Sequence, residues 1–241
     1  MPPIIGITTG RRLVGPSPGQ ESAHATLATY TTMVRAAGGI PILLVPGSDD
    51  EAKRVLGLID GLLLSGGGDV DPARYEGARP ASVYAVDGAR DGFEITLSRL
   101  AAERRLPTLC ICRGLQVMNV AMGGTLIEDI ADENPAHLIH RMDGDEAHQA
   151  RHAVTIEPGS STAKALGREQ LEVNTLHHQA VRAIGSGLVA TGFAPDGIVE
   201  SLAPEDPEWP MWAVQWHPEY LGPSDEPSLA LFEAFIRAAG G

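Results

Sequence analysis

The chain has 241 residues, 43% of them hydrophobic and 20% charged, which is the ordinary composition of a globular protein with a large core. A formal net charge of −13 disfavours binding to nucleic acid or to an anionic membrane, so we expect a small-molecule ligand. The N-terminus lacks the pattern of a signal peptide and no apolar run is long enough to span a membrane, so a cytoplasmic location is expected.

Strand-like and helical patterns alternate through the first half of the chain. The β-branched run at residues 4–9 predicts a strand, and residues 21–37, after a Gly/Pro-rich loop, predict a helix. Residues 40–45 predict a buried strand. The same patterns predict further strands at 61–65 and 107–111 and helices at 49–58, 91–105 and 113–121. This alternation indicates βαβ units, so we expect a parallel sheet with helices on both faces.

The pattern changes after Gly123. Short strand-like runs follow at 152–157, 188–193, 197–201 and 211–216, and an amphipathic helix capped by Ser224 or Asp225 is predicted at 224–239. Short strands without helices between them predict a mixed or antiparallel edge of the sheet. The expected fold class is therefore α/β, a three-layer sandwich with a mostly parallel central sheet, in a single domain over residues 1–241.

Both cysteines of the chain lie in the stretch LCICRGLQ, residues 109–116. Two cysteines alone cannot form a zinc site, and a Cys110–Cys112 disulfide would close a small, strained ring. The remaining possible roles for each thiol are a nucleophile or a side chain packed in the core. Cys112 falls at the turn from a strand into a helix, where a side chain is exposed at the end of the sheet and the helix N-terminus lowers a thiol pKa. Cys110, within the strand, is expected to pack in the core, and Gly114 would let the helix begin close to the strand.

A second strand-to-helix turn has the sequence SGGGDVDP, residues 65–72. Its three glycines would leave backbone N–H groups free to face a ligand, or would form only a tight connection. No Gly-Lys-Ser/Thr follows, which disfavours a phosphate loop. Asp69 and Asp71 are expected to stabilise the turn.

A candidate base for a cysteine nucleophile occurs near the C-terminus, in WAVQWHPEY. His217 and Glu219 are two positions apart, so in an extended segment their side chains point to the same side, and Pro218 stiffens the link. The alternative is a histidine at a strand end beside an unrelated surface glutamate.

Taken together, these motifs resemble those of the class I glutamine amidotransferase superfamily, which has a Cys-His-Glu triad. Within that superfamily the resemblance is to the gamma-glutamyl-gamma-aminobutyrate hydrolase family, which has a flavodoxin-like fold. The stretches that carry the resemblance are LLLSGGGDVDPARY, LCICRGLQVMNVAMGGTLIEDI, VNTLHHQAV, DGIVES and VQWHPE.

The resemblance implies a role for each matching position. Cys112 would be the nucleophile, His217 its base, and Glu219 the carboxylate that orients the imidazole. The backbone N–H groups of Gly67 and Arg113 would form the oxyanion hole. The residues expected to contact the substrate are Gln116, His177, His178 and Gln179. No metal or organic cofactor is implied.

One position departs from the family pattern, because Cys110 occupies a place where glycine is usual. A strand position without a positive φ accepts cysteine, so we expect the change to alter packing and not chemistry.

The segment 137–152 contains His137, His140, His148 and His152. Their spacing raises the question of a metal site, but Gly144 would interrupt a helix and the neighbouring residues are charged. We therefore predict a mobile surface loop with no metal. In the family that the motifs resemble, this stretch flanks the active site, so the resemblance implies that the loop covers the substrate.

Three functions are compatible with these features. The first is a hydrolase that cleaves the γ-glutamyl amide bond of small γ-glutamyl compounds, as in polyamine catabolism, and that acts alone or as a homodimer. The second is a glutaminase subunit that delivers ammonia to a separate synthase. The third is a catalytically silent binding protein of the same fold, which would be expected to lose one of the three triad residues.

Overall fold

One nine-stranded sheet runs through the computed structural model, which describes residues 1–78, 80–134, 137–141 and 149–241. Its strands, in their order across the sheet, are β4 (Ile40–Leu44), β1 (Ile4–Thr8), β5 (Gly61–Leu64), β6 (Thr108–Ile111), β13 (Met211–Val214), β12 (Val199–Pro204), β11 (Leu188–Phe193), β8 (His152–Ile156) and β9 (Gln170–Val173). The strands from β4 to β13 are parallel, and those from β13 to β9 are antiparallel. The predicted parallel sheet with an antiparallel edge is confirmed.

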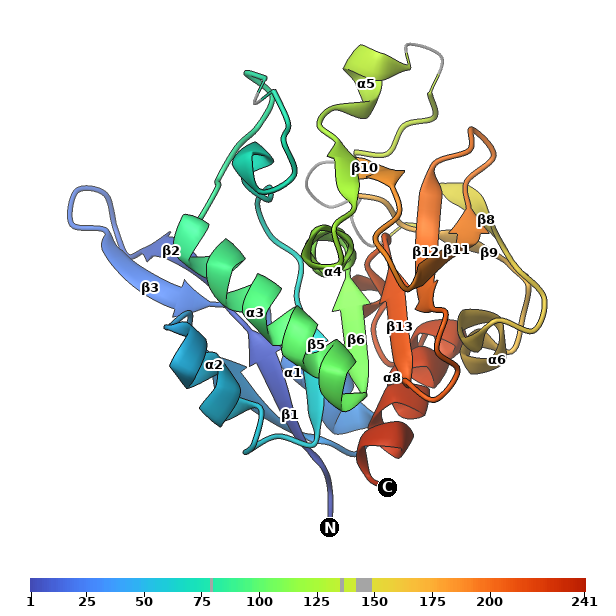
Figure 1. Cartoon of the computed structure of the whole chain (residues 1–241), viewed down its shortest axis with the longest axis horizontal. Coiled ribbons are helices and arrows are strands. Elements are labelled where there is room, and N and C mark those ends of the chain that lie inside the picture. The colour runs from blue at the N-terminus through green and yellow to red at the C-terminus, as the bar shows by residue number, and fades with distance from the viewer. Residues whose placement is uncertain (79, 135–136, 142–148) are drawn as a thin grey trace.

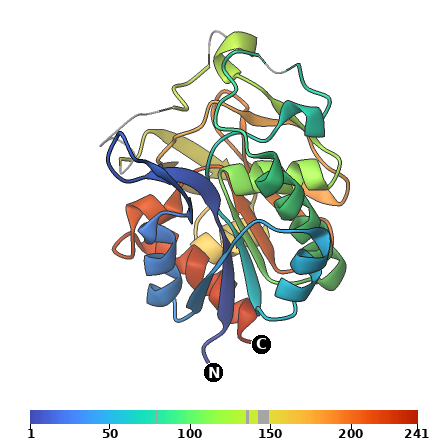
Figure 2. The same cartoon turned by 90° about the vertical axis from the view of Figure 1, so that its left-hand side faces the viewer.

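Helices cover both faces of the sheet, as Figures 1 and 2 show. One layer contains α2 (Asp49–Val55), α3 (Gly88–Arg104) and α4 (Arg113–Ala121), and the opposite layer contains α1 (Ala28–Ala36), α6 (Ser161–Leu166), α7 (Pro218–Leu221) and α8 (Glu226–Ala239). Asp225 caps α8, as predicted. The smaller elements are the 3-10 helix η1 (Pro72–Arg74), helix α5 (Ile130–Glu133), the pair β7 (Thr125–Ile127) and β10 (Ala180–Ala183), and the hairpin β2 (Gly10–Val14) and β3 (Glu21–Ala25). The three-layer α/β sandwich expected from the sequence is confirmed.

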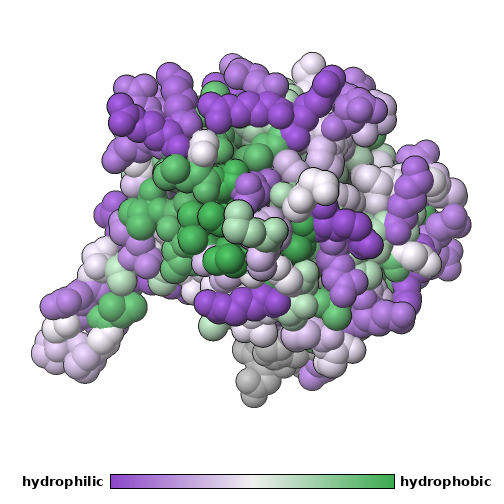
Figure 3. Space-filling model, turned by 90° about the horizontal axis from the view of Figure 1, so that it is seen from below, coloured by the Kyte–Doolittle hydropathy of each residue, from purple (hydrophilic) through white to green (hydrophobic). Residues whose placement is uncertain are grey.

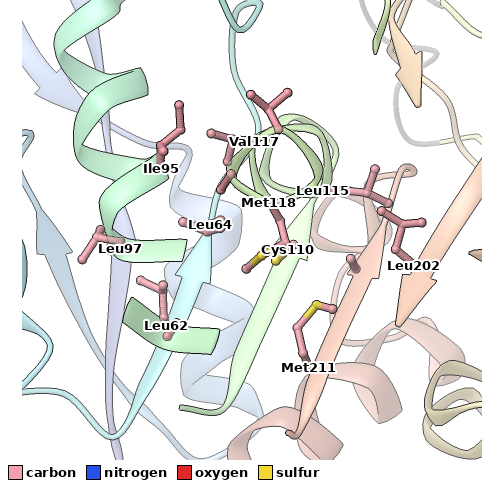
Figure 4. Close-up of a cluster of buried hydrophobic side chains, with 14 of the residues drawn as sticks. Leu62, Leu64, Ile95, Leu97, Cys110, Leu115, Val117, Met118, Leu202 and Met211 are labelled. Atoms are coloured by element: carbon pink, nitrogen blue, oxygen red, sulfur yellow. The ribbon is translucent and has the colours of Figure 1, made fainter. Parts of the chain in front are cut away.

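Side chains of the central strands alternate between the two helical layers. Leu62 and Leu64 of β5 and Cys110 of β6 pack with α3 and α4, in the cluster shown in Figure 4. Leu63 and Leu109 point to the opposite layer and pack with α1 and α8. This two-sided burial explains why these strands are continuous apolar runs in the sequence. Cys110 is fully buried, so its predicted packing role is confirmed.

The helix predicted over residues 21–37 is only partly correct. Its first residues form β3, which pairs with β2, and the helix α1 begins later, at Ala28. The Gly/Pro-rich stretch between β2 and β3 reverses the chain, so the two segments on either side of it satisfy each other's backbone hydrogen bonds. Most side chains of this hairpin are exposed, so neither strand carries a clear hydrophobic period.

The strand predicted at residues 40–45 is present as β4, but its predicted burial is wrong. β4 is the edge of the sheet, and Ile40, Ile42 and Leu43 are exposed because the strand has only one neighbour. Seen from below, the molecule has a marked hydrophobic area on one side (Figure 3). The homodimer expected from the sequence remains a prediction, and an unpaired apolar edge is the surface on which to test it.

The histidine-rich segment does not form a surface loop throughout. His140 and His152 are buried, and His152 begins β8. His137 is half-buried and hydrogen-bonds to the carbonyl of Asn134, whereas His148 lies outside the described residues. Charged neighbours along the chain make the segment look solvated, but distant partners in the antiparallel half of the sheet bury two of its imidazoles.

Among the described residues, no helix is both long enough and apolar enough to cross a bilayer.

Candidate active site

Cys112 occupies a strained turn between β6 and α4. Its φ of 52° and ψ of −108° lie in a region that L-residues rarely adopt. The backbone N–H of Cys112 donates to the carbonyl of Val214, which ties the turn to the end of β13. A Cβ added to Gly114 would lie 2.1 Å from the carbonyl oxygen of Leu64, so the predicted close approach of helix and strand at Gly114 is confirmed. This geometry is that of a nucleophile held at the end of a parallel sheet.

Strand pairing brings His217 to the same edge of the sheet. β13 is parallel to β6, with Val214 beside Ile111. Both strands therefore end at the same edge of the sheet, just before His217 and Cys112 respectively. The ring Nδ1 of His217 lies 2.7 Å from Oε1 of Glu219. A proton on Nδ1 shared with this carboxylate leaves Nε2 for the thiol.

Charge interactions set the protonation of His217. Burial alone would lower its pKa, but hydrogen bonding and charge interactions with Cys112 and Glu219 raise the pKa well above its usual range. His217 is therefore biased towards its imidazolium form, the charge that supports a neighbouring cysteine nucleophile.

Asn174 holds the backbone of His217 in place. Its side-chain Nδ2 donates to the carbonyl of His217 at 2.9 Å, and its Oδ1 accepts from the N–H of His217 at 3.1 Å. Two hydrogen bonds to one residue fix the point at which the chain leaves β13.

Tyr30 of α1 joins the Gly-rich turn to the same site. Its hydroxyl accepts from the N–H of Gly66 at 2.8 Å. Burial first, and the nearby Glu219 second, raise the pKa of Tyr30, so the phenol stays neutral. Tyr30 belongs to none of the stretches that carry the family resemblance. Asn174 lies within one of them, VNTLHHQAV, but the resemblance assigned it no role.

A cavity of about 330 Å³ opens in front of Cys112. Its wall includes Cys112, His217, Gly67 and Arg113. Within the described part of the chain, the backbone N–H groups of Gly67 and Arg113 make no hydrogen bond to a backbone carbonyl. Two such N–H groups beside a candidate nucleophile are what an oxyanion hole requires, and this role of Gly67 and Arg113 stays a prediction.

A buried network of charges holds these two backbone segments together. The side chain of Arg113 pairs with Asp91 and Glu94 of α3. Arg90 pairs with Glu94 at 2.8 Å and donates to the carbonyls of Ser65 and Gly66, each at 3.0 Å. The two arginines and two carboxylates balance in charge, which buried ions require. A Cβ on Gly67 would lie 2.2 Å from the Arg90 guanidinium, so the turn has room only for glycine there.

The four predicted substrate-binding residues lie away from the cavity wall among the described residues. Gln116 is buried, and its Nε2 donates to the carbonyl of Gln179 at 3.1 Å and to Oε1 of Gln215 at 3.2 Å. The ring of His177 is buried and faces Glu200, with Nε2 and Oε1 3.4 Å apart. Direct contact of Gln116, His177 and Gln179 with the substrate therefore remains a prediction.

His178 points elsewhere, into a pair of aspartates. Its Nε2 lies 3.1 Å from a carboxylate oxygen of Asp69, and its Nδ1 lies 3.1 Å from Asp129. Burial opposes a charged ring, but both carboxylates favour it, and the net effect is a raised pKa of His178. Asp71, by contrast, accepts from the N–H of Ala73 and caps η1, which confirms its structural role.

The sequence matches the Peptidase C26 family over residues 3–219. The chain belongs to the Peptidase C26 family. It is 33% identical over 242 residues to protein NtpR of Enterococcus hirae, an alignment that covers 98% of this chain and 99% of NtpR. It is 32% identical over 250 residues to the gamma-glutamyl-gamma-aminobutyrate hydrolase PuuD of Escherichia coli strain K12, covering 98% of this chain and 93% of PuuD.

A solved structure from Thermoplasma acidophilum, described as a GMP synthase subunit, shares the fold of this C26 protein. The TM-score is 0.65 at 15% identity, and the match covers 100% of this chain and 95% of the other. The resemblance to class I glutamine amidotransferases and to gamma-glutamyl-gamma-aminobutyrate hydrolases is confirmed at the level of family and fold.

Proposed function

We propose that the protein is a cysteine hydrolase that cleaves the γ-glutamyl amide bond of small γ-glutamyl compounds of the γ-glutamyl-γ-aminobutyrate type. One observation supports this above the others: Cys112, at a strained turn, lines one cavity with His217, whose ring is held by Glu219. The strained backbone at Cys112 costs free energy of folding, and a catalytically silent binding protein would gain nothing from it.

The residues act in two steps. The Cys112 thiolate attacks the γ-carbonyl carbon, and the N–H groups of Gly67 and Arg113 stabilise the negative oxygen that forms. The carbon–nitrogen bond breaks as the imidazolium of His217 transfers its proton to the leaving amine. Neutral His217 then takes a proton from water, and the hydroxide attacks the γ-glutamyl thioester, which releases glutamate and restores the thiolate.

The charge of the cavity suits an amine that carries a carboxylate. Arg11 and Arg12 of the β2–β3 hairpin line the cavity, although the protein as a whole is strongly acidic. The charge of Arg12 also acts on Tyr220, whose ring packs against His217. A γ-aminobutyrate leaving group would place its carboxylate towards these guanidinium groups, whereas ammonia, the leaving group of glutamine, gains nothing from them.

The decisive experiment compares two substrates with the purified chain alone. We expect glutamate release from γ-glutamyl-γ-aminobutyrate much faster than from glutamine, measured by coupled glutamate detection. Cys112→Ser serves as the inactive control.

The second candidate is a glutaminase subunit that passes ammonia to a separate synthase, since the fold is shared with a protein described as a GMP synthase subunit. Such a protein keeps its thiolate idle until a partner docks. Negligible activity on every γ-glutamyl amine, with glutamine hydrolysis only in the presence of a synthase, would favour it over the hydrolase. Binding of γ-glutamyl compounds without turnover would instead favour the silent binding protein.

A further inference from the structure

Three histidines converge on one buried glutamate in the antiparallel half of the sheet. Glu200 belongs to β12, His152 begins β8, His140 precedes β8, and His177 follows β9. All four side chains are buried. None of them lines the cavity in front of Cys112. These four residues, the His/Glu200 cluster, are therefore distinct from the proposed reaction centre.

Each of the three histidine rings has one nitrogen that faces away from Glu200 and lies within hydrogen-bonding distance of an oxygen acceptor. His140 Nε2 lies 2.9 Å from Oδ2 of Asp196, in the turn between β11 and β12. His152 Nδ1 lies 3.2 Å from its neighbouring carbonyl, that of Ala153, and His177 Nδ1 lies 3.0 Å from the carbonyl of Gln179. Because these partners are acceptors, the outer nitrogens carry the protons, and in neutral imidazoles the inner nitrogens are lone-pair donors. Such outer-sphere partners are characteristic of metal-bound histidines.

The inner nitrogens all face the same oxygen. Oε1 of Glu200 lies 3.5 Å from His140 Nδ1, 3.6 Å from His152 Nε2 and 3.4 Å from His177 Nε2. Among the described residues, none of these three nitrogens and neither oxygen of Glu200 has a hydrogen-bond partner, although all are buried. Burying so many polar atoms without a hydrogen bond is costly unless something sits between them.

The distances between the three nitrogens and the glutamate oxygen indicate what lies between them. They exceed the length of a good hydrogen bond between nitrogen and oxygen, about 2.7–3.2 Å. Two ligands of one tetrahedral zinc ion, each about 2.0–2.1 Å from the metal, lie roughly 3.3–3.4 Å from one another. The atoms are thus too far apart to bond directly and close to the spacing of ligands around a common ion.

We propose that the His/Glu200 cluster is a binding site for a divalent transition metal, with zinc as the best match. His140 Nδ1, His152 Nε2 and a Glu200 oxygen, which all lie within 4.8 Å of one another, form the core of the site. His177 Nε2 lies 3.4 Å from the same glutamate oxygen but outside this group of atoms, so it would supply the fourth position after a small movement of its ring. Imidazole and carboxylate donors suit zinc, and a single negative ligand leaves the site with a charge of only +1.

A metal with four protein ligands has no open position, so its role is structural. It would join segments far apart in the sequence and fix the stretch from Asn174 to Gln179. That stretch holds the backbone of His217 through Asn174 and the side chain of Gln116 through Gln179. The metal thereby supports the reaction centre without touching it.

The first test is the metal content of the full-length chain, purified without a polyhistidine tag and measured by elemental mass spectrometry. We expect about one zinc per chain. Glu200→Gln and His152→Ala should each lower this stoichiometry at least several-fold. His24→Ala, which removes an exposed histidine from β3, should leave it unchanged.

A second test uses the unaltered protein, so it does not depend on whether a variant folds. Removal of metal with a chelator should lower the melting temperature by about 5 °C or more, and added Zn²⁺ should restore it. Added Co²⁺ should give the visible absorption of a tetrahedral site. Absence of metal after purification, together with a melting temperature that neither chelator nor Zn²⁺ moves, would overturn the proposal and leave the cluster as an ion-pair network. Neither readout depends on the proposed hydrolase activity.

Discussion

The two halves of the central sheet carry their polar side chains in different ways. In the parallel half, Cys112 and His217 follow the ends of neighbouring strands and face a cavity. In the antiparallel half, Glu200 lies within β12 and faces His152, at the start of β8, in the interior. The first arrangement leaves reactive atoms open to a ligand, whereas the second encloses them. Access to the cavity therefore separates the proposed reaction centre from the proposed metal site.

The largest effect should come from exchanging the two cysteines one at a time. Cys112→Ser is expected to lower kcat/KM by at least about a thousandfold, because an alkoxide forms far less readily than a thiolate. Cys110→Ser should leave most activity and lower stability, since burial raises the pKa of that thiol and keeps it a packing group. Assays and thermal melts of both variants provide the comparison. Equal loss of activity in two folded variants would contradict the assignment of Cys112.

His217 and Glu219 should differ in the size of their effects. His217→Ala removes the group that carries the proton, whereas Glu219→Gln keeps a side chain that still orients the ring. The fall in kcat/KM should therefore be about ten- to a hundredfold smaller for Glu219→Gln than for His217→Ala. Near wild-type activity in His217→Ala would exclude the proposed base.

The pH profile separates these two roles further. The raised pKa of His217 means that the imidazolium persists to higher pH, so kcat/KM should fall on the alkaline side as pH rises through that pKa. Glu219→Gln removes one cause of the elevation, so its alkaline limb should move to lower pH. An alkaline limb unchanged in Glu219→Gln would show that another group sets it.

Asn174 tests whether the two halves of the sheet act independently. It lies beyond β9 in the antiparallel half but makes two hydrogen bonds to the backbone of His217. Asn174→Ala should lower kcat by about tenfold with little change in KM, because a misplaced imidazole slows proton transfer without altering substrate binding. Asn134→Ala, near α5, is the control. Equal changes in kcat and KM for Asn174→Ala would indicate a general disturbance of the site.

The parallel half could be predicted from the sequence because its signals are local. Each central strand is an apolar run followed by a turn with small residues, and Cys112 and Gly114 lie at such a turn. Parallel strands place consecutive turns at one edge, so the proximity of the Gly-rich turn to Cys112 followed from the fold class.

Most strands of the antiparallel half were also predicted, but the meeting of their side chains could not be. His140, His177 and Glu200 lie in segments that the sequence singled out separately. Nothing in those segments connects the three residues, which meet only through the pairing of strands distant in sequence. The β2–β3 hairpin was missed for a related reason: its exposed strands bury few side chains and leave no hydrophobic period. Register between distant strands is set by tertiary packing, which no single segment encodes.

The smallest effect should come from Arg12, whose charge lies in neither half of the sheet but on the exposed hairpin. The guanidinium is solvated, so its attraction for a substrate carboxylate is worth about 1 kcal/mol or less, a factor of about five in binding. Arg12→Gln should therefore raise KM about fivefold for γ-glutamyl-γ-aminobutyrate and leave kcat nearly unchanged. It should have little effect on a γ-glutamyl amide whose leaving amine has no carboxylate.

Arg35→Gln, on the exposed side of α1, is the matched control for loss of one surface cation. The contrast between substrates is essential, because a variant that merely disturbed the hairpin would raise KM for both. If Arg12→Gln raises KM equally for the two substrates, the hairpin shapes the cavity but does not discriminate between leaving amines by their charge. The electrostatic interpretation predicts that Arg12→Gln raises KM only for the substrate whose leaving amine carries a carboxylate. It also predicts that about 0.5 M salt, which shortens the screening length to about 4 Å, removes the difference in KM between the two substrates in the wild type.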